Sequence, residues 1–181
     1  STQEESTSAH SWEDAASAYS SAAVTSVTSS NNTTPNVLAT LIRHDLWSVS
    51  PSTVVQALSV LSHEVKAGGQ SAQIVQFGGL LAVLRAMETH TRDTTVQVAA
   101  CSLLTQLDAF AVAIAQVGAL ETLVTTLKQH AANVDVCRAA TIAVAAIGEP
   151  APGLVETLAA CMQQHTNDTS IQESCFSALA S

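Results

Sequence analysis

The stretch "AMETHTRDTTVQ", residues 86–97, occurs in altered form twice more along the chain. The other two copies are "TLKQHAANVDVC", residues 126–137, and "CMQQHTNDTSIQ", residues 161–172. In each copy a Met or Leu stands three residues before a His, an Asn or Asp three residues after it, and a Val or Ile three residues further on. The His residues are 40 and 35 positions apart. Such self-similarity is typical of a chain built from repeated structural units.

The residues before each His predict a helix. Apolar side chains recur ten, seven and three positions ahead of the His, a spacing that places them on one helical face. A glycine precedes each of these helices and ends the element before it: Gly78-Gly79, Gly118 or Gly153. The predicted inward residues are Leu80, Val83 and Met87, then Leu120, Leu123 and Leu127, then Val155, Leu158 and Met162.

A second helix is predicted after each His. Asp93, Asn133 or Asp168 would cap it, because an Asx side chain accepts a backbone N–H from the first turn. Ala or Cys at the same phase of each second helix indicates a close approach between helices. The predicted inward residues are Val96, Ala100, Leu103, Leu104 and Leu107, then Val136, Ala140, Ala143, Val144 and Ile147, then Ile171, Cys175, Ala178 and Leu179.

A weaker copy lies upstream around His44. Ser50 and Pro51 mark the start of its second helix, since Pro favours the first helical position. Short third helices are predicted before two of the glycines, whereas the two prolines of "GEPAP", residues 148–152, exclude one there. The predicted inward residues of this copy are Val37, Leu41, Val54, Ala57, Val60 and Leu61.

These patterns predict an all-α protein, a right-handed α-solenoid of about four units, because stacking buries the apolar face that one unit leaves open. We expect a disordered tail at 1–10, a helix of a partial preceding unit plus linker at 11–34, and units at 35–77, 78–117, 118–152 and 153–181, the last one truncated. Helices are expected near 36–44, 52–65, 70–77, 79–90, 94–108, 111–117, 119–130, 134–147, 153–165 and 169–180.

The composition limits the classes of function. The net charge of −9 argues against sequence-independent nucleic-acid binding and against docking on anionic membranes. The N-terminus is polar and acidic rather than a signal peptide, and no apolar run reaches the length of a membrane span, so a cytoplasmic protein is expected. The four cysteines form no C-x-x-C pair and are predicted to be buried, reduced thiols.

The motifs "IVQFGGLLAVLRAM…TTVQVAACSLLTQL" and "AIAQVGALETLVTTL…VDVCRAATIAVAAI" resemble the armadillo repeat, over about residues 35–181. HEAT and other helical repeats remain an alternative. The resemblance implies a peptide-binding groove lined by the longest helix of each unit. Importin-like members hold a peptide with a ladder of Asn and of Trp, and neither ladder is present here. The Asn positions read His63, Gln106, Ala146 and Ser181, and the Trp positions read Ser59, Ser102, Ile142 and Ser177.

No catalytic, metal or cofactor site is predicted. The chain lacks a Gly-x-Ser-x-Gly elbow, a phosphate-binding Gly loop and a His-Glu-x-x-His motif. One His per unit cannot share a metal, because stacked helices lie about 8–10 Å apart and zinc ligands lie about 2 Å from the ion. Each repeated His is instead expected to meet the last carbonyls of its own helix.

The sequence therefore favours a non-catalytic scaffold that binds another protein or peptide, of basic character given the acidic chain. The alternatives are a self-assembly element whose ends stack into a homo-oligomer, and an importin-like adaptor, which the missing ladders disfavour. Trp47 is predicted to cover the apolar edge of the first unit, with partner binding as the alternative. The predicted groove residues are Gln56, Ser59, His63, Ser102, Gln106, Arg138 and Ile142.

Overall fold

The computed structural model describes residues 33–67 and 70–180, and this part of the chain is all-helical. The described ranges contain ten α-helices, two short 3-10 turns and no strand. All ten predicted helices are present, with ends that differ from the expected ones by three residues or fewer. The predicted tail at 1–10, and residues 11–32 of the predicted N-terminal segment, lie outside the described residues.

Most helices come in consecutive pairs. The first members are α2 (Thr33–Arg43), α5 (Gly79–Thr89), α8 (Ala119–Gln129) and α10 (Leu154–Gln164). The second members are α3 (Pro51–Lys66), α6 (Thr94–Gln106), α9 (Val134–Ile147) and α11 (Thr169–Ala180). Short helices α4 (Ser71–Gln76) and α7 (Ala111–Gln116) precede two of the pairs, and the 3-10 turns are η1 (Asp45–Trp47) and η2 (Asp108–Phe110).

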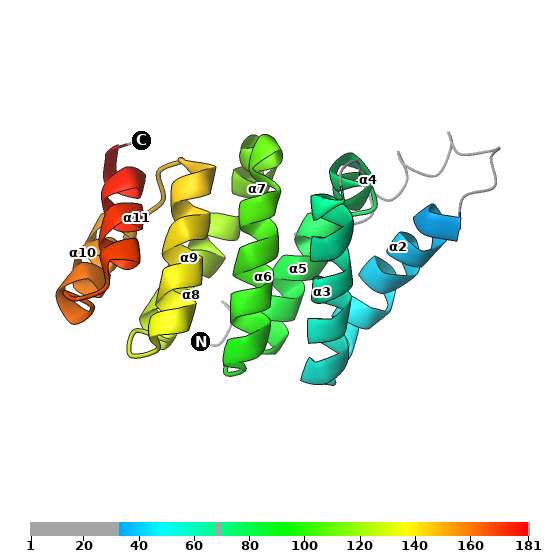
Figure 1. The fold of residues 1–181 in the computed structure, drawn as a ribbon, viewed down its shortest axis with the longest axis horizontal. Coiled ribbons are helices and arrows are strands. Elements are labelled where there is room, and N and C mark those ends of the chain that lie inside the picture. Colours follow the sequence, from blue (N-terminus) through cyan, green and yellow to red (C-terminus); the bar gives the residue numbers. More distant parts are fainter. Residues whose placement is uncertain (1–32, 68–69, 181) are drawn as a thin grey trace, which may run out of the picture.

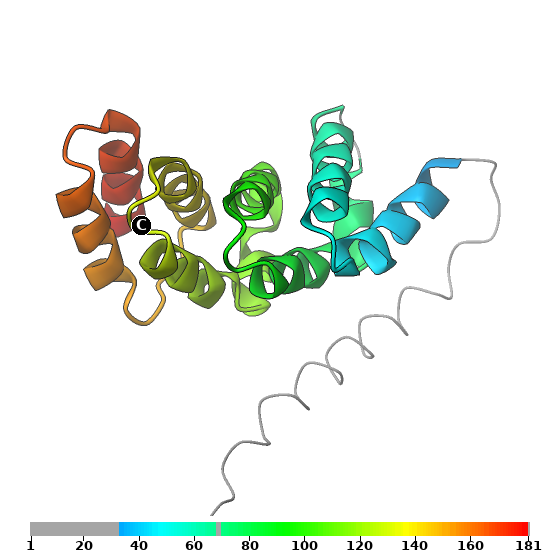
Figure 2. The same ribbon diagram turned by 90° about the horizontal axis from the view of Figure 1, so that it is seen from below.

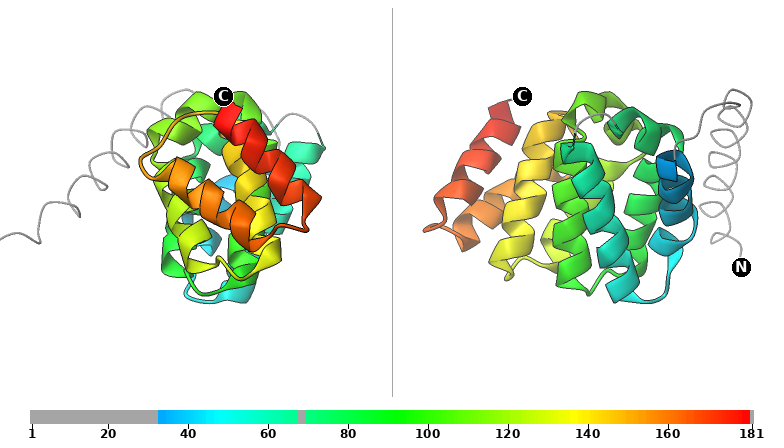
Figure 3. Two further views of the ribbon diagram at one scale, coloured as in Figure 1. Left: turned by 90° about the vertical axis from the view of Figure 1, so that its left-hand side faces the viewer. Right: turned by 45° about the vertical axis from the view of Figure 1, so that its right-hand side comes forward.

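The second members of the pairs lie side by side in chain order, from α3 through α6 and α9 to α11, and each contacts the next (Figure 1). The first members form another row on the opposite side, which Figure 2 shows edge-on. Seen along the rows, the pairs stand one behind another and the two helices of the α10–α11 pair cross obliquely (Figure 3). Each pair therefore packs mainly against the pairs before and after it.

Local sequence explains where the helices begin. The Asp93 carboxylate accepts hydrogen bonds from the backbone N–H groups of Thr95 and Val96, both at 3.0 Å, and thereby caps α6. Asn133 caps α9 in the same way. Gly118 has a φ of 82°, in the left-handed region that favours glycine, at the sharp turn into α8. These are the caps and turns that the repeat predicts.

The core lies between the two rows and consists of aliphatic side chains with Ala and Cys at the tightest points. Most predicted inward residues are buried, but Val37, Val60 and Val155 are 48%, 41% and 61% exposed. Leu38 and Leu154 are buried in place of their neighbours Val37 and Val155, and on α3 Leu58 is buried in addition to the predicted Leu61. A 3.6-residue period leaves adjacent positions as near-equal candidates, so the rotation of each helix is set by its neighbours. Leu179 is also exposed, and Leu41, Met162 and Ala178 are only partly buried.

Within the described ranges, no single helix has both the length and the apolarity that crossing a membrane requires. The segments Thr94–Gln106 and Asp108–Gln116 reach that composition only together, across a bend of 76°.

Candidate functional site

The helices α3, α6 and α9 border an open groove of about 670 Å³. Its apolar lining residues are half-buried, whereas the exposed lining residues carry hydroxyl or carboxylate groups. Four of the seven predicted groove residues line it, namely Ser59, Ser102, Arg138 and Ile142. The other described lining residues are Val55, Thr94, Thr95, Val98, Ala99, Asn133, Asp135 and Ala139.

The remaining three predicted residues, Gln56, His63 and Gln106, do not line this groove. Gln56 and His63 are exposed on α3. The Gln106 amide is engaged: its Oε1 accepts a hydrogen bond from Ser62 at 2.9 Å, and its Nε2 donates to the Ser102 carbonyl at 3.0 Å. Gln106 therefore joins α6 to α3 and does not present a free amide to a ligand.

Arg138 is the single cationic residue among the described residues that line the groove. Its guanidinium lies 2.6 Å from Asp168 Oδ2 and 3.2 Å from Asp135 Oδ1. The hydrogen bond to Asp168 is the main reason why the pKa of Arg138 is raised. The same bond, followed by the Ile171 N–H, lowers the pKa of Asp168. Two carboxylates thus offset one guanidinium, and the α9 side of the groove is locally acidic.

The three repeated His residues link consecutive pairs. His90 Nε2 donates to the Ser48 carbonyl at 3.0 Å, and His130 Nε2 to the Thr91 carbonyl at 2.6 Å. His165 Nε2 donates to the Ala131 carbonyl at 2.7 Å. Each acceptor lies in the loop within the preceding pair, 34–42 residues earlier. The repeated His therefore forms a ladder of equivalent contacts between pairs.

The predicted partner of the repeated His is wrong, although its place at the helix C-terminus is confirmed for α5, α8 and α10. The residue seven positions after each His meets the helix-end carbonyls instead. Gln97 Nε2 donates to the Met87 and His90 carbonyls at 2.8 and 3.1 Å. Gln172 makes the matching pair of hydrogen bonds to Met162 and His165. Because the carbonyls of its own helix end already have a partner, the imidazole is available to the preceding pair.

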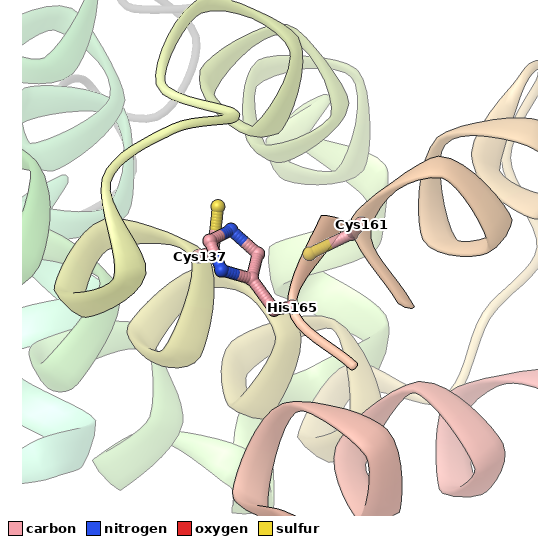
Figure 4. Close-up of side chains that lie close together, drawn as sticks. All are labelled: Cys137, Cys161 and His165. Atoms are coloured by element: carbon pink, nitrogen blue, oxygen red, sulfur yellow. The ribbon is translucent and has the colours of Figure 1, made fainter. Parts of the chain in front are cut away.

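Cys137, Cys161 and the repeated His165 form a side-chain cluster, with a cysteine at the position where Gln97 and Gln172 stand in the other copies. Cys137 comes from α9, Cys161 from α10 and His165 from the C-terminal end of α10 (Figure 4). One ligand atom of each lies within 4.8 Å of the other two. Cys137 and His165 both contact the loop that joins α8 to α9, where the Cys137 thiol donates to the Ala131 carbonyl at 3.5 Å and the His165 imidazole to the same oxygen at 2.7 Å.

The thiols of the cluster are electrostatically linked. Hydrogen bonds from Cys137 and then Cys175 lower the pKa of Cys161, and the nearby His165 acts in the same direction. The pKa of Cys137 and of Cys175 is raised, first by donating to Cys161 and then by burial. Burial alone raises the pKa of the isolated Cys101 to about 12.

All four cysteines are buried and free, as their pattern in the sequence predicts, but that pattern does not predict the cluster. Metal-ligand motifs are found by short spacing, and here the two thiols are separated by a helix, a loop and most of another helix. The repeat contains the missing signal. Thr126 Oγ1 donates to Gln97 Oε1 at 3.1 Å. Cys161 stands at the position of Thr126, four residues before the repeated His, and Cys137 stands at the position of Gln97, seven residues after it.

Trp47 does not cover the apolar edge of its unit. Its side chain is 59% exposed, while the neighbouring Leu46 is buried in the same 3-10 turn. The lid interpretation is therefore wrong, and Leu46 fills that space.

Comparison with family models, with curated proteins and with solved structures finds no match to this chain.

Proposed function

We propose that this chain is a right-handed α-solenoid of armadillo-like units, and that its α3–α6–α9 groove binds an extended, basic segment of another protein. The chain acts as a non-catalytic scaffold in a reducing compartment such as the cytoplasm. The observation that carries the proposal is the open groove that the second helices of three successive pairs border.

Two features support the solenoid. The helices of each row follow one another in chain order, and equivalent residues repeat the same contact from pair to pair, as the His ladder does. Nearest-neighbour contacts of this kind are the property that defines a repeat array. The armadillo assignment rests on the sequence motifs and on short helices α4 and α7 ahead of two of the pairs.

The chemistry of the groove supports an extended partner. Its small apolar lining residues, Val98, Ala99 and Ala139, allow a main chain to approach closely. The hydroxyl of Ser102 and the carboxylate of Asp135 belong to exposed lining residues, where they can meet main-chain groups and cationic side chains. The overall charge of −9 adds long-range attraction for a basic segment.

The test is a selection from a displayed library of random, unstructured 12-residue peptides against the full chain. We expect enriched peptides to carry Lys or Arg and to bind more weakly as salt is added. Ser102→Arg places a long cation in the groove at an exposed position and should abolish binding. Ala159→Arg, at an exposed position of α10 in the other row, adds the same charge and is the matched control.

Arg138→Glu is a poor probe, because it would also break the contact with Asp168. If no peptide is enriched, or if Ser102→Arg binds the enriched peptides as well as Ala159→Arg does, the groove is not the binding surface and the proposal fails.

Self-assembly remains a second candidate because Val155, Phe176 and Leu179, on α10 and α11, are 61%, 62% and 42% exposed. Multi-angle light scattering at increasing concentration tests it. Growth of the molar mass that Phe176→Ser prevents would support end-to-end stacking, and a constant monomer mass would exclude it.

A further inference from the structure

The cluster of Cys137, Cys161 and His165 lies between the α8–α9 pair and the α10–α11 pair. At the corresponding place between the α5–α6 pair and the α8–α9 pair there is a hydrogen bond between two polar side chains. In that other interface, Gln97 on α6 is hydrogen-bonded to Thr126 on α8, and His130 bonds to the Thr91 carbonyl. We call this set the Gln–Thr interface and the corresponding set of Cys137, Cys161 and His165 the Cys–Cys interface. The backbone contact of the His is the same in both, so the difference is confined to the paired side chains.

The three ligand atoms of the Cys–Cys interface are nearly in place for one metal ion. They lie within 4.8 Å of one another. In a tetrahedral zinc site, a Zn–S distance of about 2.3 Å places two sulfurs about 3.8 Å apart. The donors therefore need to approach by only about 1 Å, a shift within the reach of side-chain rotation and small helix movement.

One contact of the cluster is of the kind that imidazole ligands make in metal sites. The Ala131 carbonyl accepts a hydrogen bond from His165 and orients its ring, as backbone carbonyls commonly do for imidazole ligands. Cys137 and Cys161 are buried, whereas His165 is only partly buried. The thiol of Cys175 contacts Cys161 from α11 and adds a hydrogen-bond donor beside its sulfur.

We propose that Cys137, Cys161 and His165 bind one thiophilic metal ion, Zn²⁺ in the first instance, across the contact between α9 and α10. Two thiolates and one imidazole favour zinc over the harder Mg²⁺ and Ca²⁺, which take oxygen ligands. Binding releases the thiol protons to solvent and leaves the metal with a position for water. The ion fastens the C-terminal end of α10 to the N-terminal end of α9, at the ends of the two helices away from the "GEPAP" connection that replaces the short helix found before α5 and α8.

The test is titration of the reduced, full chain with Co²⁺, followed by displacement with Zn²⁺. We expect one ion per chain, a thiolate-to-cobalt charge-transfer band, and an increase in the melting temperature with Zn²⁺. Cys101→Ala is the matched control, because Cys101 is a buried thiol of α6 outside the cluster and its removal should leave metal binding unchanged.

The informative variant is Cys137→Gln with Cys161→Thr. It gives the Cys–Cys interface the residue pair of the Gln–Thr interface, so we expect it to fold. It should retain the helical circular dichroism and lose metal affinity by at least about 100-fold. The proposal is wrong if the double variant binds Co²⁺ as the wild type does, or if the reduced wild type binds no ion. A Cys137–Cys161 disulfide that forms in air, together with no metal binding after reduction, also overturns it.

Discussion

The Gln–Thr interface and the Cys–Cys interface have the same framework but different side chains. Both keep a His that donates to a backbone carbonyl of the preceding pair, and both keep an Asx cap three residues after that His. The first interface joins its two helices through the hydrogen bond from Thr126 to Gln97, and the second through the contact between the Cys137 and Cys161 thiols. The His contact and the cap recur in both, whereas the paired position changes. A change of chemistry at that position is therefore compatible with the fold.

If the two interfaces share one framework, equivalent apolar residues should be buried beside both. Leu123 and Leu158 stand seven residues before their His, and both are fully buried. We expect Leu123→Ala and Leu158→Ala each to lower the free energy of unfolding by about 2–5 kcal/mol, through lost transfer energy and a residual cavity. Urea denaturation measures this. Val155→Ala, at an exposed position, should change it by less than about 0.5 kcal/mol. A Leu158→Ala variant as stable as the wild type would show that the second interface packs differently.

The next largest effect compares Gln97 with Cys137, which stand at the same position of the two interfaces. Gln97→Leu removes hydrogen bonds to the Met87 and His90 carbonyls and leaves Thr126 without its buried acceptor. We expect it to destabilise the chain by about 1–3 kcal/mol. Cys137→Ala, measured with reductant and chelator present, should cost less because a thiol makes weaker hydrogen bonds. Equal losses in urea denaturation would mean that the two interfaces do not differ as proposed.

A comparison of His130 with His165 tests whether zinc binds at the Cys–Cys interface. Without metal, His130→Leu and His165→Leu each remove one hydrogen bond to a backbone carbonyl and should each cost about 0.5–1.5 kcal/mol. With Zn²⁺ present, only the His165 variant should lose additional melting temperature relative to the wild type. A difference between the two variants that does not depend on zinc would contradict this.

The smallest effect concerns the caps. The lowered pKa of Asp168 means that its carboxylate stabilises the fold above its unfolded pKa, about 3.9, and that this contribution is lost as the pH falls through the lower folded pKa. Asn133 occupies the equivalent position without a charge. Asp168→Asn should therefore lose less stability than the wild type as the pH falls below this unfolded pKa. Thermal melts at decreasing pH test it, with Asp108→Asn, on the exposed η2 turn, as the control.

The helices could be predicted closely because periodicity, glycines and Asx caps are local signals. Asp93 and Asn133 mark the starts of α6 and α9 with no tertiary information. The exposure of Val155 and burial of Leu154 could not be read in the same way, because the choice between adjacent residues depends on how the helix is rotated against its neighbours. That rotation is a property of the assembled structure rather than of one segment.

The site was less predictable for a related reason. Ser102 and Arg138 follow from their helical phase, whereas the use of Gln106 by Ser62 depends on a neighbouring helix. The Cys–Cys interface joins two units, and no spacing rule for one motif covers it. The contact between Gln97 and Thr126 implies that Cys137 and Cys161, at the equivalent positions of the next unit, also meet. That contact is itself known only from the structure.

The His ladder has a consequence for how such a chain can lengthen. His90 is a donor and the next residue, Thr91, is an acceptor; His130 and Ala131 are arranged in the same way. Both halves of the contact thus lie in one dipeptide, so a gene duplication that copies one unit also copies a complete pair of matching ends. An inserted unit would dock on its predecessor and receive its successor without a compensating mutation elsewhere. Growth by whole units is therefore an evolutionary step that this backbone already accommodates.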